Sequence, residues 1–155
     1  MNYEIYKKHD DIAYMKLAIE QSKLSFCKKK KVGAVIVQKN QIISCGYNRT
    51  PSGFDNICEE KNGVTKWYVI HAEENAILKL SSSSLSCKGA SIYVTHFPCQ
   101  ECCKLIYQST IRRVIYLHEY TKNDQGMVFL KKLKIKIEKL NPGGEIGIRA
   151  GLKIQ

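Results

Sequence analysis

Three side chains of the kind that bind zinc occur in two short segments, and a glutamate stands next to one of them. His71 and Glu73 are two positions apart, and Cys99 and Cys102 are three positions apart further along the chain. Zinc commonly takes imidazole and thiolate ligands, and a site with three protein ligands keeps a fourth position for water. The pattern therefore predicts a catalytic zinc site made by His71, Cys99 and Cys102.

Glu73 is not needed as a ligand in such a site, and its carboxylate is predicted to move protons. It can accept a proton from water, pass it to a ring nitrogen and then protonate a departing amine. This order of transfers fits a hydrolysis that releases ammonia. An H-x-E segment followed by P-C-x-x-C is present here as residues 71–73 and 98–102, and it is the signature of zinc deaminases that act on nucleobases. Glu74 is expected to be solvated instead.

Two other interpretations of these residues remain open. A C-x-x-C pair alone is also typical of thioredoxin-like redox sites, although that would leave His71 and Glu73 unexplained. A structural zinc would need a fourth protein ligand, and His96 is the nearest candidate. Without that role, His96 is predicted to be a surface or packed histidine, as are His9 and His118.

Size and composition favour one folded domain over residues 1–155. The chain has 44% hydrophobic residues, no long apolar run and a charged N-terminal segment. Neither a membrane span nor a secretory signal is therefore expected, and the predicted location is the cytoplasm. Cysteines in that reducing compartment stay as thiols, so those outside the zinc motif are expected to be small buried residues. These are Cys27, Cys45, Cys58, Cys87 and Cys103.

The formal net charge of +11 favours an anionic partner, either a nucleic acid or a nucleotide phosphate. Much of the excess lies in Lys28–Lys31 and in Lys131–Lys139. In the second segment, apolar and charged residues alternate from Leu133 to Ile137, which is typical of a half-buried strand. Charge alone does not separate the two kinds of partner.

The order of expected elements indicates an α/β protein. A helix from Asp10 or Asp11 to about Lys23 precedes a hairpin with strands at 32–37 and 41–46. His71 and Pro98 each begin a further helix. Strands at 90–94, 114–117 and 133–137 alternate with the helices, and the segment 141–155 is expected to be peripheral. A hairpin followed by alternating helices and strands predicts a mixed sheet with helices packed on its faces.

Four segments resemble the deoxycytidylate deaminase family, and the resemblance extends from about residue 14 to residue 140. They are VGAVIV at 32–37, GYNRTPSG at 46–53, HAEENAI at 71–77 and FPCQECCKLI at 97–106. The resemblance implies a cytidine-deaminase-like three-layer α/β/α fold with a mixed five-stranded sheet. It also implies hydrolysis of dCMP to dUMP and ammonia, which supplies dUMP for thymidylate synthesis.

The same resemblance implies positions for substrate contacts. Asn48 would bind the sugar or phosphate, and Lys30 lies where the family places a phosphate-binding cation. Asn48 could equally satisfy its own turn, and Lys30 could belong to a solvated lysine run. Tyr120 matches a family tyrosine near the substrate, although packing would also explain it. The remaining expected pocket residues are Thr50, Pro51, Ser52 and Ala72.

Further family properties carried over are one catalytic Zn²⁺ per subunit and assembly into a homo-oligomer, usually a hexamer. Regulation by dCTP and dTTP, with Mg²⁺ accompanying the effector, is expected as well. The chain departs from the family pattern at two places. Arg49 replaces the usual glycine after Asn48, and Ser109-Thr110 replaces a small–Gly pair, so the third helix is expected to end without a glycine cap.

Two other functions compete with dCMP deamination. One is a tRNA-specific adenosine deaminase, which the basic charge would suit. The other is a non-enzymatic zinc protein that binds nucleic acid. The long polar loop from residue 48 to residue 66 favours a closed nucleotide pocket over an open RNA groove, so nucleic acid is not the expected partner.

Overall fold

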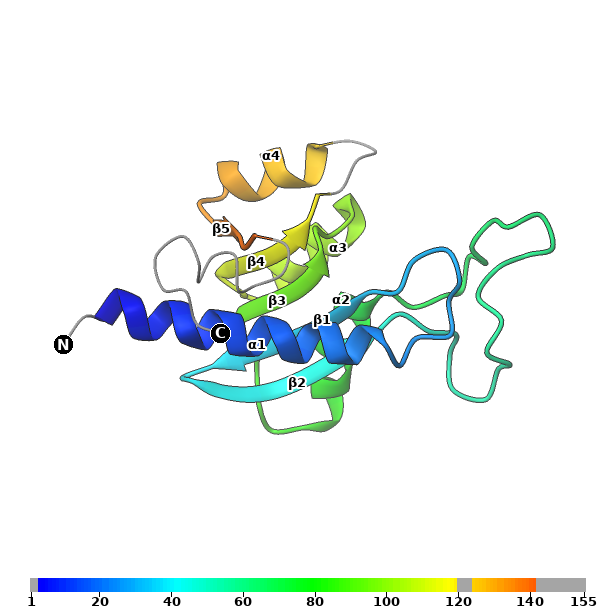
Figure 1. The fold of residues 1–155 in the computed structure, drawn as a ribbon, viewed down its shortest axis with the longest axis horizontal. Coiled ribbons are helices and arrows are strands. Elements are labelled where there is room, and N and C mark those ends of the chain that lie inside the picture. The colour runs from blue at the N-terminus through cyan, green and yellow to red at the C-terminus, as the bar shows by residue number, and fades with distance from the viewer. Residues whose placement is uncertain (1–2, 120–123, 142–155) are drawn as a thin grey trace.

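A computed structural model describes residues 3–119 and 124–141 of the chain. These residues form a five-stranded sheet with strand order β2-β1-β3-β4-β5 and helices on both faces (Figure 1). The elements in chain order are α1 (Tyr3–Ser22), β1 (Gly33–Gln38), β2 (Gln41–Tyr47), α2 (Ala72–Lys79), the 3₁₀ helix η1 (Leu80–Ser82), β3 (Ser91–His96), α3 (Gln100–Gln108), β4 (Arg113–His118), α4 (Gln125–Lys132) and β5 (Lys136–Lys139).

The sheet is mixed, as predicted. β1 runs antiparallel to both β2 and β3, whereas β3, β4 and β5 run parallel to one another. Parallel strands need a crossover on a face of the sheet, and α3 and α4 supply the two crossovers. The ends of β3 and β4 therefore lie at the same edge as the starts of the helices that follow them. The chemistry-bearing residues gather at this edge.

Alternate side chains of the strands enter two separate cores, because successive strand residues point to opposite faces. Ile36 and Val94 belong to the core beneath α2, α3 and α4. Val35 and Tyr93 belong to the core beneath α1, where they meet Met15. Each core seals one face of the sheet, so α1 forms one outer layer and the other three helices form the opposite one. The predicted three-layer α/β/α architecture is confirmed.

Glycines at two positions allow helices to approach the hairpin closely. A Cβ atom at Gly33 would clash with the backbone of α1 at Ala18, and one at Gly46 would lie 2.8 Å from the carbonyl oxygen of Ala72 in α2. Contacts this short leave no room for any side chain. Gly33 thus fixes the distance between the hairpin and α1, and Gly46 fixes the distance between the hairpin and the helix that follows His71.

Several expected boundaries were wrong. α1 begins at Tyr3 instead of Asp10 or Asp11. β5 begins at Lys136, because α4 continues to Lys132 and Lys134 then adopts a left-handed turn with φ 63°. The alternation of apolar and charged residues that begins at residue 133 therefore covers the end of a helix and a turn. Only its last part lies in the strand. The expected peripheral segment 141–155 lies, beyond Asn141, outside the described residues.

The expectation that all cysteines outside the zinc motif are thiols was also wrong. Cys27 and Cys58 are buried but form a disulfide. The pairing is possible because the segment after α1 packs against the long loop: the Ser25 hydroxyl donates to the carbonyl of Asn48, and the Lys28 amide donates to Glu59. None of the helices in the described ranges has the length and apolar character needed to cross a bilayer.

Candidate active site

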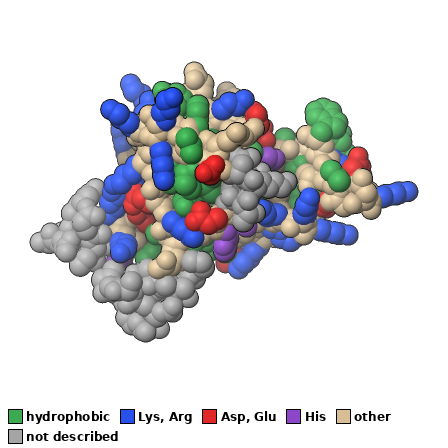
Figure 2. Space-filling view, turned by 90° about the horizontal axis from the view of Figure 1, so that it is seen from above, with side chains coloured by type: hydrophobic (Ala, Val, Ile, Leu, Met, Phe, Trp, Pro, Cys, Tyr) green, Lys and Arg blue, Asp and Glu red, His purple; other side chains and the backbone are tan. Residues whose placement is uncertain are grey.

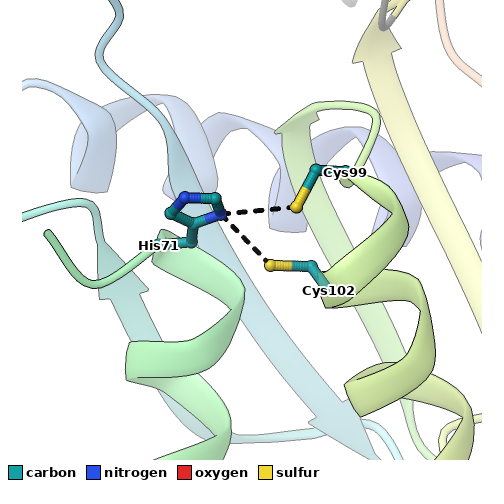
Figure 3. A group of neighbouring side chains, drawn as sticks. All are labelled: His71, Cys99 and Cys102. Carbon is teal, nitrogen blue, oxygen red and sulfur yellow. Dashed lines mark hydrogen bonds between the residues drawn. The ribbon is translucent and has the colours of Figure 1, made fainter. Parts of the chain in front are cut away.

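Two helix starts bring three possible metal ligands together (Figure 3). His71 is the N-cap of α2, Cys99 is the N-cap of α3, and Cys102 lies in the first turn of α3. The Nδ1 atom of His71 is 3.5 Å from Sγ of Cys99 and 3.4 Å from Sγ of Cys102. In the described part of the chain, the group of possible metal ligands found contains these three residues, and His96 is not among them.

These separations fit a tetrahedral zinc site. With Zn–N near 2.0–2.1 Å and Zn–S near 2.3 Å, tetrahedral geometry places nitrogen and sulfur about 3.6 Å apart. The two measured nitrogen–sulfur distances fall within about 0.2 Å of that value. His71, Cys99 and Cys102 could therefore hold zinc with little rearrangement. The predicted convergence of the two motifs is found.

The three side chains of the cluster share protons through hydrogen bonds. A hydrogen bond with Cys99 raises the pKa of His71 to about 9, although burial acts in the opposite direction. Hydrogen bonds from Cys102 and then His71 lower the pKa of Cys99 to about 4. The pKa of Cys102 is raised, chiefly because its hydrogen is shared with Cys99. Zinc binding would displace these protons, since zinc requires thiolate and neutral imidazole ligands.

Glu73 lies in the first turn of α2, beside the cluster, and its side chain is buried, with 4% of the residue exposed. Burial raises the pKa of its carboxyl to about 7, although His71 nearby acts in the opposite direction. A carboxyl with this pKa can both accept and donate a proton near neutral pH. Glu74 is not simply solvated, because its carboxylate accepts a hydrogen bond from the backbone N–H of His71 and caps the helix.

A pocket of about 230 Å³ opens beside the cluster. Of the residues predicted to contact substrate or metal, it brings together His71, Ala72, Glu73, Cys99, Asn48 and Lys30. Its other lining residues are Cys27, Lys29, Val32, Glu59, Thr65, Val69, His96 and Phe97.

Asn48 has a structural role in addition to lining the pocket. Its Oδ1 atom accepts a hydrogen bond from the backbone N–H of Val32 at 2.9 Å, and its Nδ2 atom donates to the carbonyl of Lys30 at 2.7 Å. The amide thereby holds the segment that carries the pocket lysines. Both polar atoms retain further hydrogen-bonding capacity, so this role is compatible with contact to a substrate.

The other predicted pocket residues lie elsewhere or outside the described ranges. Thr50 is buried, and its hydroxyl donates to the carbonyl of Asp55. Pro51 lines a larger open groove between the long loop and α3. Ser52 is exposed and does not line either cavity. Tyr120 lies outside the described residues.

Sequence reasoning missed His96 as a pocket residue. The sequence predicts a fourth zinc ligand or a surface or packed histidine at position 96, but His96 lines the pocket at the end of β3. The available signal was its position: it is the last residue of a strand that leads directly into Pro98 and Cys99. A polar ring at the carboxyl end of a central parallel strand is well placed to meet a ligand.

Three possible metal ligands with a buried carboxylate beside them, at two helix starts on a mixed α/β sheet, form the arrangement typical of a zinc-dependent hydrolase. Comparison with protein families agrees. The chain belongs to the cytidine and deoxycytidylate deaminase family, because the model of that family's zinc-binding region matches residues 8–118.

Individual relatives support the same assignment. The chain is 33% identical to mouse deoxycytidylate deaminase over 153 residues, covering 88% of this chain and 85% of the mouse protein. It is 34% identical to ComE operon protein 2 of Bacillus subtilis over 119 residues, which span 75% of this chain but only 63% of that protein. The dCMP deaminase of cyanophage S-TIM5, solved with dCMP and dUMP, superimposes with a TM-score of 0.81 at 42% identity, covering 90% and 99% of the two chains.

Proposed function

We propose that this protein hydrolyses dCMP to dUMP and ammonia, and thereby supplies dUMP for thymidylate synthesis. The observation that carries the proposal is the buried carboxylate of Glu73 beside the cluster of His71, Cys99 and Cys102, in a pocket that Lys30 also lines. The relatives named as deoxycytidylate deaminases and the phage structure with dCMP and dUMP support this substrate.

In the proposed reaction, different side chains of the pocket bind the metal and transfer protons. His71, Cys99 and Cys102 would hold a zinc ion, and the ion would supply Lewis-acid activation of water. Glu73 takes one proton from the attacking water and gives it to N3 of cytosine. It then takes the second proton, from the hydroxyl group now on C4, and gives it to the amino nitrogen as the C4–N bond breaks. One water is consumed and one ammonia leaves, so the carboxylate returns to its starting state.

The lysines support recognition of a monophosphate. Lys29 and Lys30 line the pocket together with Asn48, and the net charge of the chain is +11. A phosphate dianion is attracted by such a surface. Glu59 also lines the pocket, but its carboxylate accepts hydrogen bonds from the backbone N–H groups of Lys28 and Lys29. Its negative charge is therefore partly compensated by the chain itself.

The direct test is a substrate panel. Zinc-loaded protein is incubated separately with dCMP, dCTP, cytidine and tRNA, and the release of ammonia is followed. The proposal expects turnover of dCMP and much slower release from cytidine. Reaction with tRNA alone would support an RNA-editing deaminase instead, and no release from any substrate by fully loaded protein would favour a zinc protein that only binds.

We also propose that the protein is a homo-oligomer, for which the resemblance implies a hexamer. The loop over residues 48–70 projects beyond the end of the sheet (Figure 1), and apolar side chains gather on this projecting part (Figure 2). Phe54, Ile57 and Val64 are more than half exposed, and Trp67 is 91% exposed. Exposed apolar groups of this size commonly mark an interface. Light scattering of the wild type and of Trp67→Lys tests the assembly, and monomeric wild type contradicts it.

Effector control by dCTP and dTTP, with Mg²⁺ bound to the nucleotide, stays a prediction of the resemblance. Its measurement is the dCMP turnover rate with each triphosphate added, in the presence and absence of Mg²⁺. Arg49 stands where the family usually has glycine, and its guanidinium lies 5.8 Å from the centre of the Tyr47 ring. We therefore expect Arg49 to change the response to effectors more than it changes the basal turnover of dCMP.

A further inference from the structure

His96 stands where the two central parallel strands end. It is the last residue of β3, and in the sheet register it pairs with His118, the last residue of β4. The two rings are 4.8 Å apart between centroids. His118 is exposed, whereas His96 is partly buried and lines the pocket that contains Glu73 and Cys99. The inner ring of this pair is thus the one that a bound ligand would meet.

The hydrogen bonds of Thr95 determine which ring nitrogen of His96 can donate a hydrogen bond to a ligand. The Nδ1 atom of His96 lies 3.1 Å from Oγ1 of Thr95, and the same hydroxyl oxygen accepts the backbone N–H of Gly33 at 3.1 Å. When the hydroxyl donates its hydrogen to Nδ1, the ring hydrogen lies on Nε2. Since Thr95 occupies Nδ1, Nε2–H is the group left to donate into the pocket.

The electrostatic surroundings of His96 are positive. Burial, together with the neighbouring His118 and Lys30, lowers the pKa of His96 to about 4. The ring is consequently neutral at physiological pH and acts as a hydrogen-bond donor within a basic environment. An anionic group of a bound substrate would therefore be attracted to this part of the pocket.

We propose that His96 is a specificity-determining residue that donates an Nε2–H hydrogen bond to the 5′-phosphate of the nucleotide, beside Lys30. This inference rests on the proposed function and deepens it, because it names a group that distinguishes a nucleotide from a nucleoside. His118 supports the ring from outside the pocket, and Thr95 fixes its hydrogen-bonding state. His96 takes no part in proton transfer, which belongs to Glu73.

The test compares the binding of dUMP and deoxyuridine, the reaction products with and without phosphate, to zinc-loaded protein by titration calorimetry. His96→Leu removes the donor, His96→Gln retains an N–H donor, and His9→Leu changes an exposed histidine of α1. A hydrogen bond to a charged group corresponds to roughly a tenfold to hundredfold effect. We expect the affinity ratio of dUMP to deoxyuridine to fall by that factor in His96→Leu, to recover partly in His96→Gln, and to stay at the wild-type value in His9→Leu.

An equal loss of affinity for both compounds in His96→Leu, or no loss, would overturn the proposal, because the ring would then serve packing alone. The same variants assayed with dCMP should show the effect mainly in KM and not in kcat. These results are separable from the proposed function. Wild-type protein that turns over dCMP while His96→Leu keeps the wild-type affinity ratio refutes only the role of His96, whereas wild-type protein inactive on dCMP refutes the function itself.

Discussion

Arg113 and Asp11, 102 positions apart in the chain, form a two-bond ion pair that joins β4 to α1. Nη1 and Nη2 of Arg113 lie 2.9 Å and 2.6 Å from the two carboxylate oxygens of Asp11. Tyr93 donates to the same carboxylate, and Glu138 on β5 accepts from Nε of Arg113. Asp11 is only 5% exposed. The pair lies where β4 begins, at the opposite end of that strand from His118.

Removing the cation of this pair should strongly destabilise the protein. Arg113→Met leaves the buried carboxylate of Asp11 without its cation, which typically costs about 3–5 kcal/mol. The free energy of unfolding in urea provides the measurement. Lys104→Met removes an exposed cation whose ion pair with Glu101 is solvated, and it should cost less than about 1 kcal/mol. Equal effects of the two substitutions would show that the buried pair has no special role.

The Cys27–Cys58 disulfide should contribute to stability and hold one wall of the pocket. It closes a loop with a sequence separation of 31 residues, for which chain entropy gives about 3–4 kcal/mol. Reductant should therefore lower the midpoint of urea unfolding of the wild type but not of a Cys27→Ser/Cys58→Ser variant. Alkylation of the denatured, unreduced protein should modify five of the seven cysteines. Modification of all seven would exclude the bond.

A glycine at the end of α3 should stabilise the protein. Thr110 follows the C-cap residue Ser109 and has a left-handed φ of 71°, which is costly for a β-branched residue. Thr110→Gly should raise the free energy of unfolding by about 0.5–1 kcal/mol after the entropy of glycine in the unfolded chain is subtracted. Ser109→Gly is the matched control, because Ser109 is right-handed and glycine there should be destabilising. A destabilised Thr110→Gly variant contradicts the strain argument.

The depressed pKa of His96, about 4 in the folded protein, predicts a pH dependence of stability. Between about pH 4 and 6.5 the unfolded chain binds the additional proton, so the free energy of unfolding falls as pH decreases through this window. His96→Leu and His96→Gln should each remove that contribution. The stability of the wild type relative to either variant should therefore decline from pH 6.5 to pH 4. A constant difference would place His96 in a solvated environment.

Most of the fold could be predicted because its signals are local. Strand alternation, the Lys39-Asn40 turn and the positions of His71 and Pro98 located the hairpin, the central strands and both helices of the site. The turn residues have φ of 51° and 61°, as a two-residue hairpin turn requires. β5 was misplaced because the same alternation occurs across the end of α4, where tertiary contacts decide the boundary.

Within the site, the convergence of His71, Cys99 and Cys102 beside Glu73 was predictable, because these residue types restrict the chemistry to few possibilities. The disulfide was not, since it depends on how two loops pack across the end of α1. The position of His96 at the end of its strand was a usable signal, but its contact with His118 depends on the register between β3 and β4. Thr50 is polar like a binding residue, but its hydroxyl satisfies a turn within its own loop. The spacing of residues in the sequence does not reveal which polar side chains are already hydrogen-bonded within their own loop.

The most direct measurement of the central claim pairs zinc content with dUMP formation in Glu73→Gln. This variant keeps the size of the side chain and all three zinc ligands but cannot accept a proton. Its matched control is Glu101→Gln, which changes an exposed carboxylate on α3. We predict one zinc per chain in the wild type and both variants, with dUMP formation reduced by about 10²-fold or more in Glu73→Gln alone. Undiminished dUMP formation by zinc-loaded Glu73→Gln would contradict the account.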